Sequence, residues 1–280
     1  MAATPSDIVL PGASGPAPPP FAHMLAPWLA KVTPFTLTSP SQFRAPEPPS
    51  LTSKRYATAF NEVKRMGARS NSDRTAEQTD LALFWYSNYL ALWERALRDI
   101  ATANQLSIDD SARLFALANL AMGDAVITAW DTKLHYHFWR PYTAIHEADN
   151  DGNPETTSDP NWLPLVNNPN YPDYTSGANN VTGAVTRMLA LFFGTDEMTF
   201  TVATNYALAN PQMPTITYHR FSDAARDVVN VRIWEGIHFR FADVQARKQG
   251  RHVAQWVFSH FLRSVDDDDH DDLDDGSDEE

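Results

Sequence analysis

The stretch of residues 107–130, SIDDSARLFALANLAMGDAVITAW, predicts the fold class. Ser107 with Asp110 has the form of a helix N-terminus, and apolar residues continue at helical spacing from Leu114 towards Trp130. Similar patterns recur along the chain, whereas we find no convincing strand alternation and no internal repeat. We therefore expect an all-α protein that folds as a helical bundle.

The other predicted elements rest on caps, apolar spacing and turn residues. The segment Thr75–Gln78 has capping-box form, and apolar residues at helical spacing follow it from Leu81 to Trp93. Residues 149–174 are dense in Asn, Asp, Pro and Gly and are predicted to form a loop. Three further helices are expected: about 179–193 with Gly194 as its stop, from the cap Ser222 to about 234, and about 241–262.

The net charge of −13 belongs almost entirely to the C-terminus. Residues 266–280 hold 11 acids and no Lys or Arg, and without them 24 acids face 22 bases. An acidic chain of this kind is not expected to bind nucleic acid through its overall field. The acidic run lacks the spaced ligands and the glycine of a calcium loop, so we interpret it as a disordered, solvated tail.

Composition divides the chain into three segments. Residues 1–50 hold 12 of the 20 prolines and are expected to form an extended arm whose second half packs on the body. Residues 51–264 are predicted to be the helical catalytic domain, and residues 265–280 the acidic tail. This single bundle would leave an apolar flank that a second subunit could cover, which favours a homo-oligomer.

Several site classes are excluded by composition. The chain has no cysteine, which rules out disulfides, Cys-based zinc sites and thiol nucleophiles. No run of about 18 consecutive apolar residues predicts a membrane span. The N-terminus lacks a signal-peptide pattern, so a cytoplasmic protein and one whose leader was removed both remain open.

Three polar clusters stand in apolar or aromatic surroundings. They are Lys133-Leu-His-Tyr-His-Phe-Trp-Arg140-Pro141, Tyr174-Thr-Ser176-Gly177-Ala178-Asn-Asn180 and Arg232-Ile-Trp-Glu-Gly-Ile-His238-Phe-Arg240-Phe-Ala-Asp243. In a continuous helix Lys133 and Arg140 would lie two turns apart on one face, about 10 Å along the axis. Two such cations resist burial unless an anion lies between them. Taken singly, the clusters are equally explained by a solvated helix end, an ordinary helix cap and a structural histidine.

Jointly, Lys-x6-Arg-Pro, then Ser-Gly, then Arg-x5-His resemble the signature of the vanadium-dependent haloperoxidases, which share their site with type 2 phosphatidic-acid phosphatases and bacterial acid phosphatases. The stretches TSPSQFRAP, FNEVK, RTAEQT, FWRPYTAI, DGNPET, DPNWLP, YPDYTSG and RIWEGIHFRFAD are similar to the chloroperoxidase-like bacterial branch. The resemblance covers about residues 34–256. It implies a helical bundle that binds vanadate, or phosphate, in one pocket.

The resemblance also implies roles for individual residues. Lys133, Arg140 and Arg232 would neutralise the equatorial oxygens of the oxyanion. Hydrogen bonds to it would come from Ser176 and the Gly177 N–H. His238 would bond to vanadium, or attack phosphorus in a phosphatase, and Trp130 would line the halide side of the pocket.

This sequence departs from the family pattern at one important position. Ala178 stands where the family carries its acid/base histidine, and general acid–base assistance is typically worth about 10²–10⁴-fold in rate. Substitutes that the sequence offers are His135, His137, His146, His219, Asn179 and Asp173, although each histidine is better explained as a structural or surface residue. Val231 replaces a frequent serine, and Asp243 lies five rather than four residues after His238.

Three functions follow as expectations. The first is a haloperoxidase-like enzyme that binds vanadate and uses hydrogen peroxide to oxidise a halide, with an organic acceptor. The second is a phosphatase of the same fold that hydrolyses a phosphate ester through a phospho-His238 intermediate. The third is a non-catalytic oxyanion-binding protein, which Ala178 makes credible. For the family, a secreted or periplasmic location is expected if a leader is removed.

Overall fold

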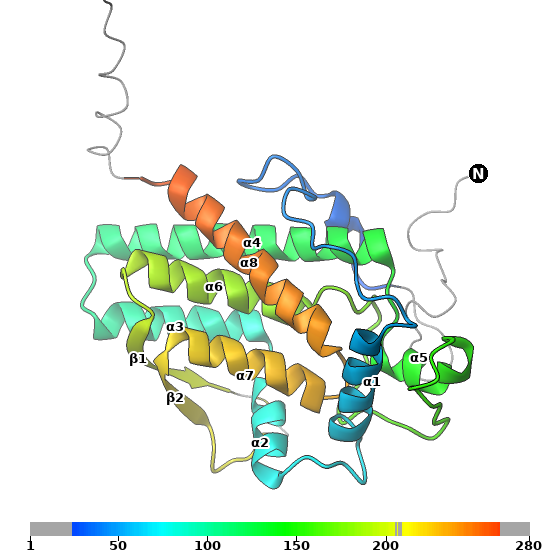
Figure 1. Cartoon of the computed structure of the whole chain (residues 1–280). Helices are drawn as coiled ribbons and strands as arrows, with labels where there is room; N and C mark the ends of the chain where they lie inside the picture. The colour runs from blue at the N-terminus through cyan, green and yellow to red at the C-terminus, as the bar shows by residue number, and fades with distance from the viewer. Residues whose placement is uncertain (1–23, 205, 207–208, 264–280) are drawn as a thin grey trace, which may run out of the picture.

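The structure is a computed structural model that describes residues 24–204, 206 and 209–263. The acidic tail predicted over residues 265–280 lies outside this part. Helices α3, α4, α6, α7 and α8 form the main bundle, while α1, α2 and α5 lie around one end of it (Figure 1). The helices are α1 (Lys54–Met66), α2 (Ala76–Trp85), α3 (Tyr89–Ala103), α4 (Ile108–Tyr136), α5 (Pro141–His146), α6 (Gly177–Phe192), α7 (Phe221–Trp234) and α8 (Arg240–His260), with short 3₁₀ helices η2 (Pro27–Lys31) and η3 (Ala148–Asn150). The predicted helical bundle is confirmed.

Capping residues explain where several helices begin. Thr75 and Gln78 form the predicted capping box of α2, and Ser107 caps α4 by accepting a hydrogen bond from the Asp110 N–H. The apolar run after Thr75 forms two helices and not one, because Asn88 caps a new helix, α3. Helix α7 is capped by the Asp196 carboxylate, which accepts from the Ser222 N–H, so the prediction of Ser222 as the cap was wrong.

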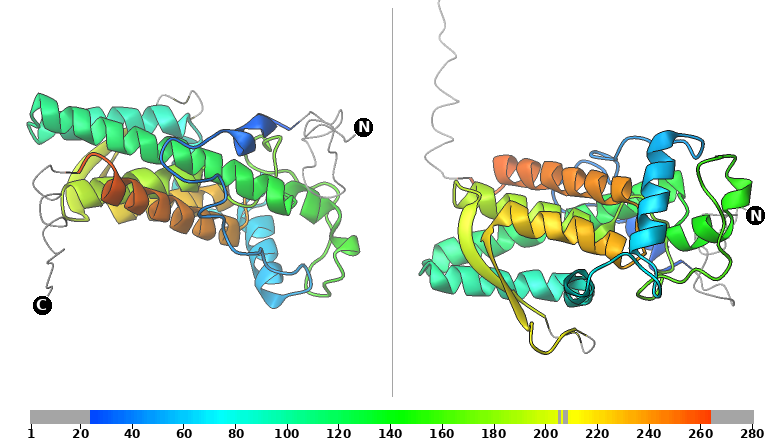
Figure 2. Two further views of the ribbon diagram at one scale, coloured as in Figure 1. Left: turned by 90° about the horizontal axis from the view of Figure 1, so that it is seen from above. Right: turned by 60° about the horizontal axis from the view of Figure 1, so that its bottom comes forward.

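Helix α6 packs closely against α8 across two glycines. A Cβ atom on Gly250 would lie 2.0 Å from the Asn180 carbonyl oxygen, and one on Gly183 would lie 2.4 Å from the Arg247 carbonyl oxygen. Only glycine allows two helix backbones to approach so closely. Figure 2 shows α8 lying across α6 and α4, and this contact sets the position of both helices around the site.

The structure contains a β-hairpin that sequence patterning missed. Strands β1 (Glu197–Ala203) and β2 (Thr215–Arg220) pair antiparallel, with Phe200 opposite Tyr218. Phe200, Val202 and Tyr218 are buried against the bundle, and their neighbours along each strand are largely exposed. The expectation of no strand was therefore wrong. The strands were missed because each is too short for its alternation of apolar and polar residues to be clear in the sequence.

The arm packs on the bundle over residues 24–50, as expected for its second half. The buried Asp124 carboxylate on α4 accepts hydrogen bonds from the N–H groups of Phe35, Thr36 and Leu37 and from the Thr36 hydroxyl, at 2.5–3.2 Å. Arg44 makes a bidentate ion pair with Asp131 at 2.7 and 2.8 Å. These contacts fasten the arm along α4.

Helix α4, extended to His146, is long and apolar enough to cross a membrane by length and hydropathy alone. In the structure it packs against α6, α8 and η2, and Leu114, Leu117 and Ala121 are fully buried. A core helix of a bundle has the same composition, so packing accounts for its apolar surface.

Candidate active site

Lys133 and Arg140 lie on different elements, and the prediction that they share one helix face was wrong. Helix α4 ends at Tyr136, because His137 adopts the left-handed conformation with φ 49°. Arg140 then takes the N-cap position of α5, followed by Pro141 in its first turn. Both side chains are fully buried nevertheless, because the chain turns back and brings the guanidinium towards the end of α4.

The third cluster forms the turn between α7 and α8. Arg232 lies in the last turn of α7, and Gly236 with φ +81° reverses the chain so that His238 points back into the bundle. Arg140 Nη1 donates to the Ile237 carbonyl at 2.6 Å. This hydrogen bond joins the first and third clusters although about a hundred residues separate them in sequence.

The segment that leads into α6 connects all of these groups through its backbone. Lys133 Nζ donates to the carbonyls of Pro172 at 2.7 Å and Asp173 at 3.1 Å, and Arg140 Nε donates to the Tyr171 carbonyl at 2.5 Å. The Tyr171 ring faces both cations, 4.9 Å from Lys133 Nζ and 4.7 Å from Arg140 Cζ. The structure therefore brings the three predicted clusters together.

The Asp173 carboxylate lies against the His238 imidazole. Nδ1 of His238 lies 2.6 Å from Oδ1 of Asp173, and both side chains are buried. Burial and the neighbouring cations Arg140 and Lys133 hold the pKa of His238 well below its ordinary value, so the ring is neutral. A proton on Nδ1, the nitrogen that faces the Asp173 carboxylate, would leave the lone pair of Nε2 free to bind an electrophile.

Asp243, five residues after His238, interacts with the start of α6. Its Oδ1 accepts from Asn179 Nδ2 at 2.8 Å, and its carboxyl group also accepts from the Ser176 hydroxyl. Burial and the nearby Asp173 raise the pKa of Asp243 well above its usual range. Ser176 is thus hydrogen-bonded to a carboxyl group at the start of α6, and its side chain does not cap that helix.

Glu235 is a buried site residue that sequence analysis did not single out. Its Oε2 lies 2.6 Å from Arg232 Nη1, and its side chain is fully buried. Burial raises the pKa of Glu235 to about 7, and likewise that of Asp173 to about 7. A glutamate within the apolar run between Arg232 and His238 was the available signal.

Two buried guanidinium donors have no partner within the described residues. They are Arg140 Nη2 and Arg232 Nε, and an unpaired buried donor of this kind is costly. Burial and Arg140 also lower the pKa of Lys133 well below its ordinary value. An anion at this place would accept from the free donors and would favour the charged form of Lys133.

A cavity lined in part by tyrosine side chains adjoins the site at Arg232. Arg232 lines a cavity of about 680 Å³ together with Tyr86, Tyr89 and Tyr171. Trp130 packs against Tyr171 with ring centroids 5.2 Å apart, and a Cβ on Gly177 would lie 3.1 Å from the Trp130 ring. Trp130 and the start of α6 therefore adjoin Tyr171, which lines the cavity.

Ala178, the position at which the resemblance implies an acid/base histidine, carries an apolar side chain. Ala178 is buried in the first turn of α6 among core residues. His219 is hydrogen-bonded to Thr199 on the hairpin, and His146 Nδ1 lies 2.7 Å from the Tyr142 carbonyl oxygen. Of the proposed substitutes, Asp173 is the one in direct contact with His238.

The structure is thus a helical bundle with a buried cationic site. Its basic side chains are Lys133, Arg140 and Arg232, and they lie near the neutral imidazole of His238. A family model for the VCPO second helical-bundle domain matches residues 113–267, and the chain therefore belongs to the vanadium haloperoxidase family. The vanadium chloroperoxidase of Curvularia inaequalis is 30% identical over an aligned length of 208 residues, and the match covers 62% of this chain and 33% of that protein. The chain thus spans about a third of this relative.

Solved structures of bacterial proteins agree with the assignment. A bacterial vanadium-dependent iodoperoxidase superposes with a TM-score of 0.76 at 27% identity, over 91% of this chain and 63% of that chain. An apo-type bacterial vanadium-dependent chloroperoxidase has a TM-score of 0.70 at 20% identity, over 89% and 59%, and supports the fold alone.

Proposed function

We propose that this chain is a vanadium-dependent haloperoxidase-like protein, which binds vanadate at His238 and uses hydrogen peroxide to oxidise a halide. The observation that carries the proposal is the pair of buried donors, Arg140 Nη2 and Arg232 Nε, that lack partners beside a neutral His238. Family membership supports the same assignment. Phosphate, which has the same shape and charge pattern, would occupy the site in the absence of vanadate.

The residues present fit an oxyanion. Arg140 and Arg232 would donate from their free atoms, Lys133 would add its charge, and the N–H of Gly177 at the start of α6 would donate from the helix N-terminus. Ser176 would have to release Asp243 before its hydroxyl could also donate. Bound vanadate would supply the Lewis acidity that activates peroxide.

Residues around the site affect both its affinity for the anion and its rate of turnover. Asp173, 2.6 Å from Nδ1 of His238, would hold the imidazole in one orientation and leave Nε2 available. Glu235 offsets part of the charge of Arg232, which weakens attraction for an anion. Because Ala178 cannot transfer a proton, we expect slow turnover relative to a site that contains the histidine.

One set of measurements tests the proposal. Vanadate binding is measured by equilibrium dialysis and vanadium NMR, and bromide- and peroxide-dependent halogenation is then assayed on the loaded protein. We expect His238→Ala to abolish both, whereas His219→Ala, on the exposed hairpin, retains both. Vanadate binding that survives His238→Ala would contradict the assignment.

The same preparation separates the alternatives. Hydrolysis of a phosphate ester without vanadate, lost in His238→Ala, would replace the proposal with a phosphatase of the same fold. Vanadate binding with neither activity would instead indicate a non-catalytic oxyanion-binding protein.

A further inference from the structure

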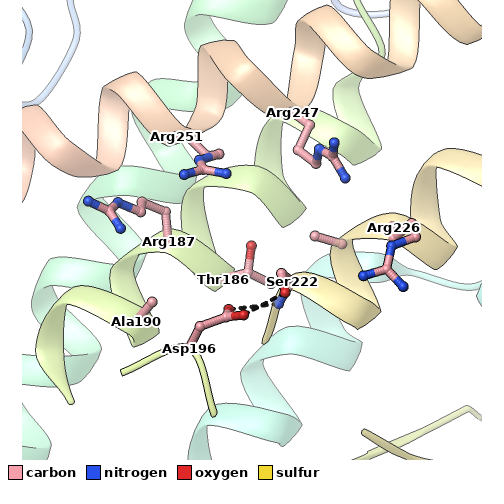
Figure 3. Close-up of a pocket in the computed structure, with 9 residues that line it drawn as sticks. Thr186, Arg187, Ala190, Asp196, Ser222, Arg226, Arg247 and Arg251 are labelled. Atoms are coloured by element: carbon pink, nitrogen blue, oxygen red, sulfur yellow. Dashed lines mark hydrogen bonds between the residues drawn. The ribbon is translucent and has the colours of Figure 1, made fainter. Parts of the chain in front are cut away.

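A second cationic pocket lies farther along α6, away from the candidate active site. Its volume is about 430 Å³, within the size range of small-molecule sites. Figure 3 shows arginine side chains from three helices around it. The charged residues of the lining are Arg187 of α6, Asp196 before β1, Arg226 of α7, and Arg247 and Arg251 of α8.

Arg247 and Arg251 have free guanidinium groups. They are one helical turn apart on α8 and therefore lie on the same face. Within the described residues neither guanidinium makes a hydrogen bond or an ion pair. Arg187 donates to Gln255 at 2.7 Å and Arg226 pairs with Asp223 at 2.7 Å, so the two α8 arginines are the ones left without partners.

The carboxylate in the pocket does not neutralise these arginines. Asp196 accepts from the Ser222 N–H at 2.9 Å and from the Ser222 hydroxyl at 2.5 Å (Figure 3). It is therefore used to cap α7. Four guanidinium groups against one carboxylate leave a net charge of +3 in the lining.

The arginines of the pocket repel one another, and the fold holds them close together in spite of this repulsion. Arg247 is half-buried, and its pKa is lowered by burial and by the charges of Arg251 and Arg226. The backbone of Arg247 is held against Gly183 of α6 by the close helix contact. The positions of the α8 arginines are thus set by core packing, and an anion between them would relieve the repulsion.

We propose that this arginine pocket is a second anion site, which binds a compact polyanion of the phosphate class such as pyrophosphate. The planar guanidinium fork pairs with phosphate oxygens in a bidentate manner. Several arginines from different helices match a ligand whose charges are close together. Thr186, ten residues after Ser176, places the pocket about 15 Å along α6 from the first site, so both can be occupied at once.

Pyrophosphate binding to the full chain tests the proposal, measured by isothermal titration calorimetry at constant ionic strength. The double variant Arg247→Gln/Arg251→Gln removes the free guanidinium groups. The control Arg98→Gln/Lys54→Gln removes the same charge from two exposed positions outside the pocket lining. Urea unfolding of each variant verifies that it remains folded.

We expect the double variant to bind pyrophosphate at least about ten-fold more weakly, because charge-assisted hydrogen bonds are lost, and the control to bind like the wild type. Equal weakening in both variants, or no binding to the wild type, would overturn the proposal. Arg232→Gln separates the two sites: pyrophosphate binding that depends on Arg232 and not on Arg247 and Arg251 would place the ligand in the candidate active site. Vanadate binding by the double variant would be unchanged.

Discussion

We predict that the charged Glu235 carboxylate lowers the affinity of the candidate active site for an anion, and that Glu235→Gln raises it. The Glu235 carboxylate lies 2.6 Å from Arg232 Nη1. An anion on the far side of the guanidinium would then lie about 8 Å from the carboxylate. At an effective dielectric constant of about 20 the repulsion at that distance is about 2 kcal/mol, which corresponds to about 30-fold in affinity.

The sign of the effect depends on pH. Burial raises the pKa of Glu235 to about 7, so its carboxyl group is neutral at pH 5.5 and charged at pH 8.5. The Gln variant is neutral at both. We therefore expect wild type and variant to bind phosphate equally at pH 5.5. At pH 8.5 the variant should bind at least about 30-fold more tightly, because the 2 kcal/mol is for one charge on the anion and phosphate then carries about two.

The assay is phosphate titration by calorimetry at both pH values, with Glu77→Gln, an exposed position on α2, as the control. Comparison at one pH cancels the titration of phosphate itself. An affinity ratio that is the same at both pH values, or a variant that binds more weakly at pH 8.5, would refute the electrostatic argument.

Stability provides an independent measure of the same group. A pKa raised above the unfolded value near 4.5 means that the folded protein binds more protons between pH 4.5 and 7. The contribution of Glu235 to stability is therefore present below pH 4.5 and is lost as the pH rises through about 7. Urea unfolding of Glu235→Gln should show a smaller decline over this window than the wild type.

Three further predictions address the arm, the helix packing and the missing histidine. Asp124→Ala leaves the Thr36 N–H and its neighbours without an acceptor and should lower the free energy of unfolding by about 3–5 kcal/mol in urea titration, where a loss under about 1 kcal/mol would contradict the arm contact. Gly250→Ala places a Cβ 2.0 Å from the Asn180 carbonyl and should cost about 3 kcal/mol, so an unchanged Tm would argue against the close contact. Ala178→His should raise halogenation turnover of the vanadate-loaded protein by about 10²-fold, with Ala178→Gln as the size control, and no gain would show that another group already transfers the proton.

Local sequence patterns predicted most of the helices and their ends. The caps at Thr75 and Ser107 and the loop before Ser176 rest on hydrogen bonds between near neighbours, which a sequence displays directly. The three clusters with Lys133 and His238 were also noted from sequence, because their charged and polar residues stand in apolar surroundings. It was the resemblance to a known family that joined them into one expected site.

Tertiary structure alone decided how these groups meet. The residues that complete the site are Asp173, which contacts His238, and Glu235, which pairs with Arg232. Their roles depend on burial and on which backbone carbonyls face Lys133, and neither is visible from spacing.

The charge of the protein is likewise determined partly by the sequence and partly by the fold. The sequence by itself determined that the negative charge collects in residues 266–280 and that the rest is nearly neutral. Only the folded structure placed Arg187 and Arg226 near the α8 pair Arg247 and Arg251, and brought Lys133 and Arg140 to the same Tyr171 ring, to form two cationic sites. Electrostatic interactions fall with distance in space, so the positions of the charges in the fold, and not their sum, decide what the protein binds.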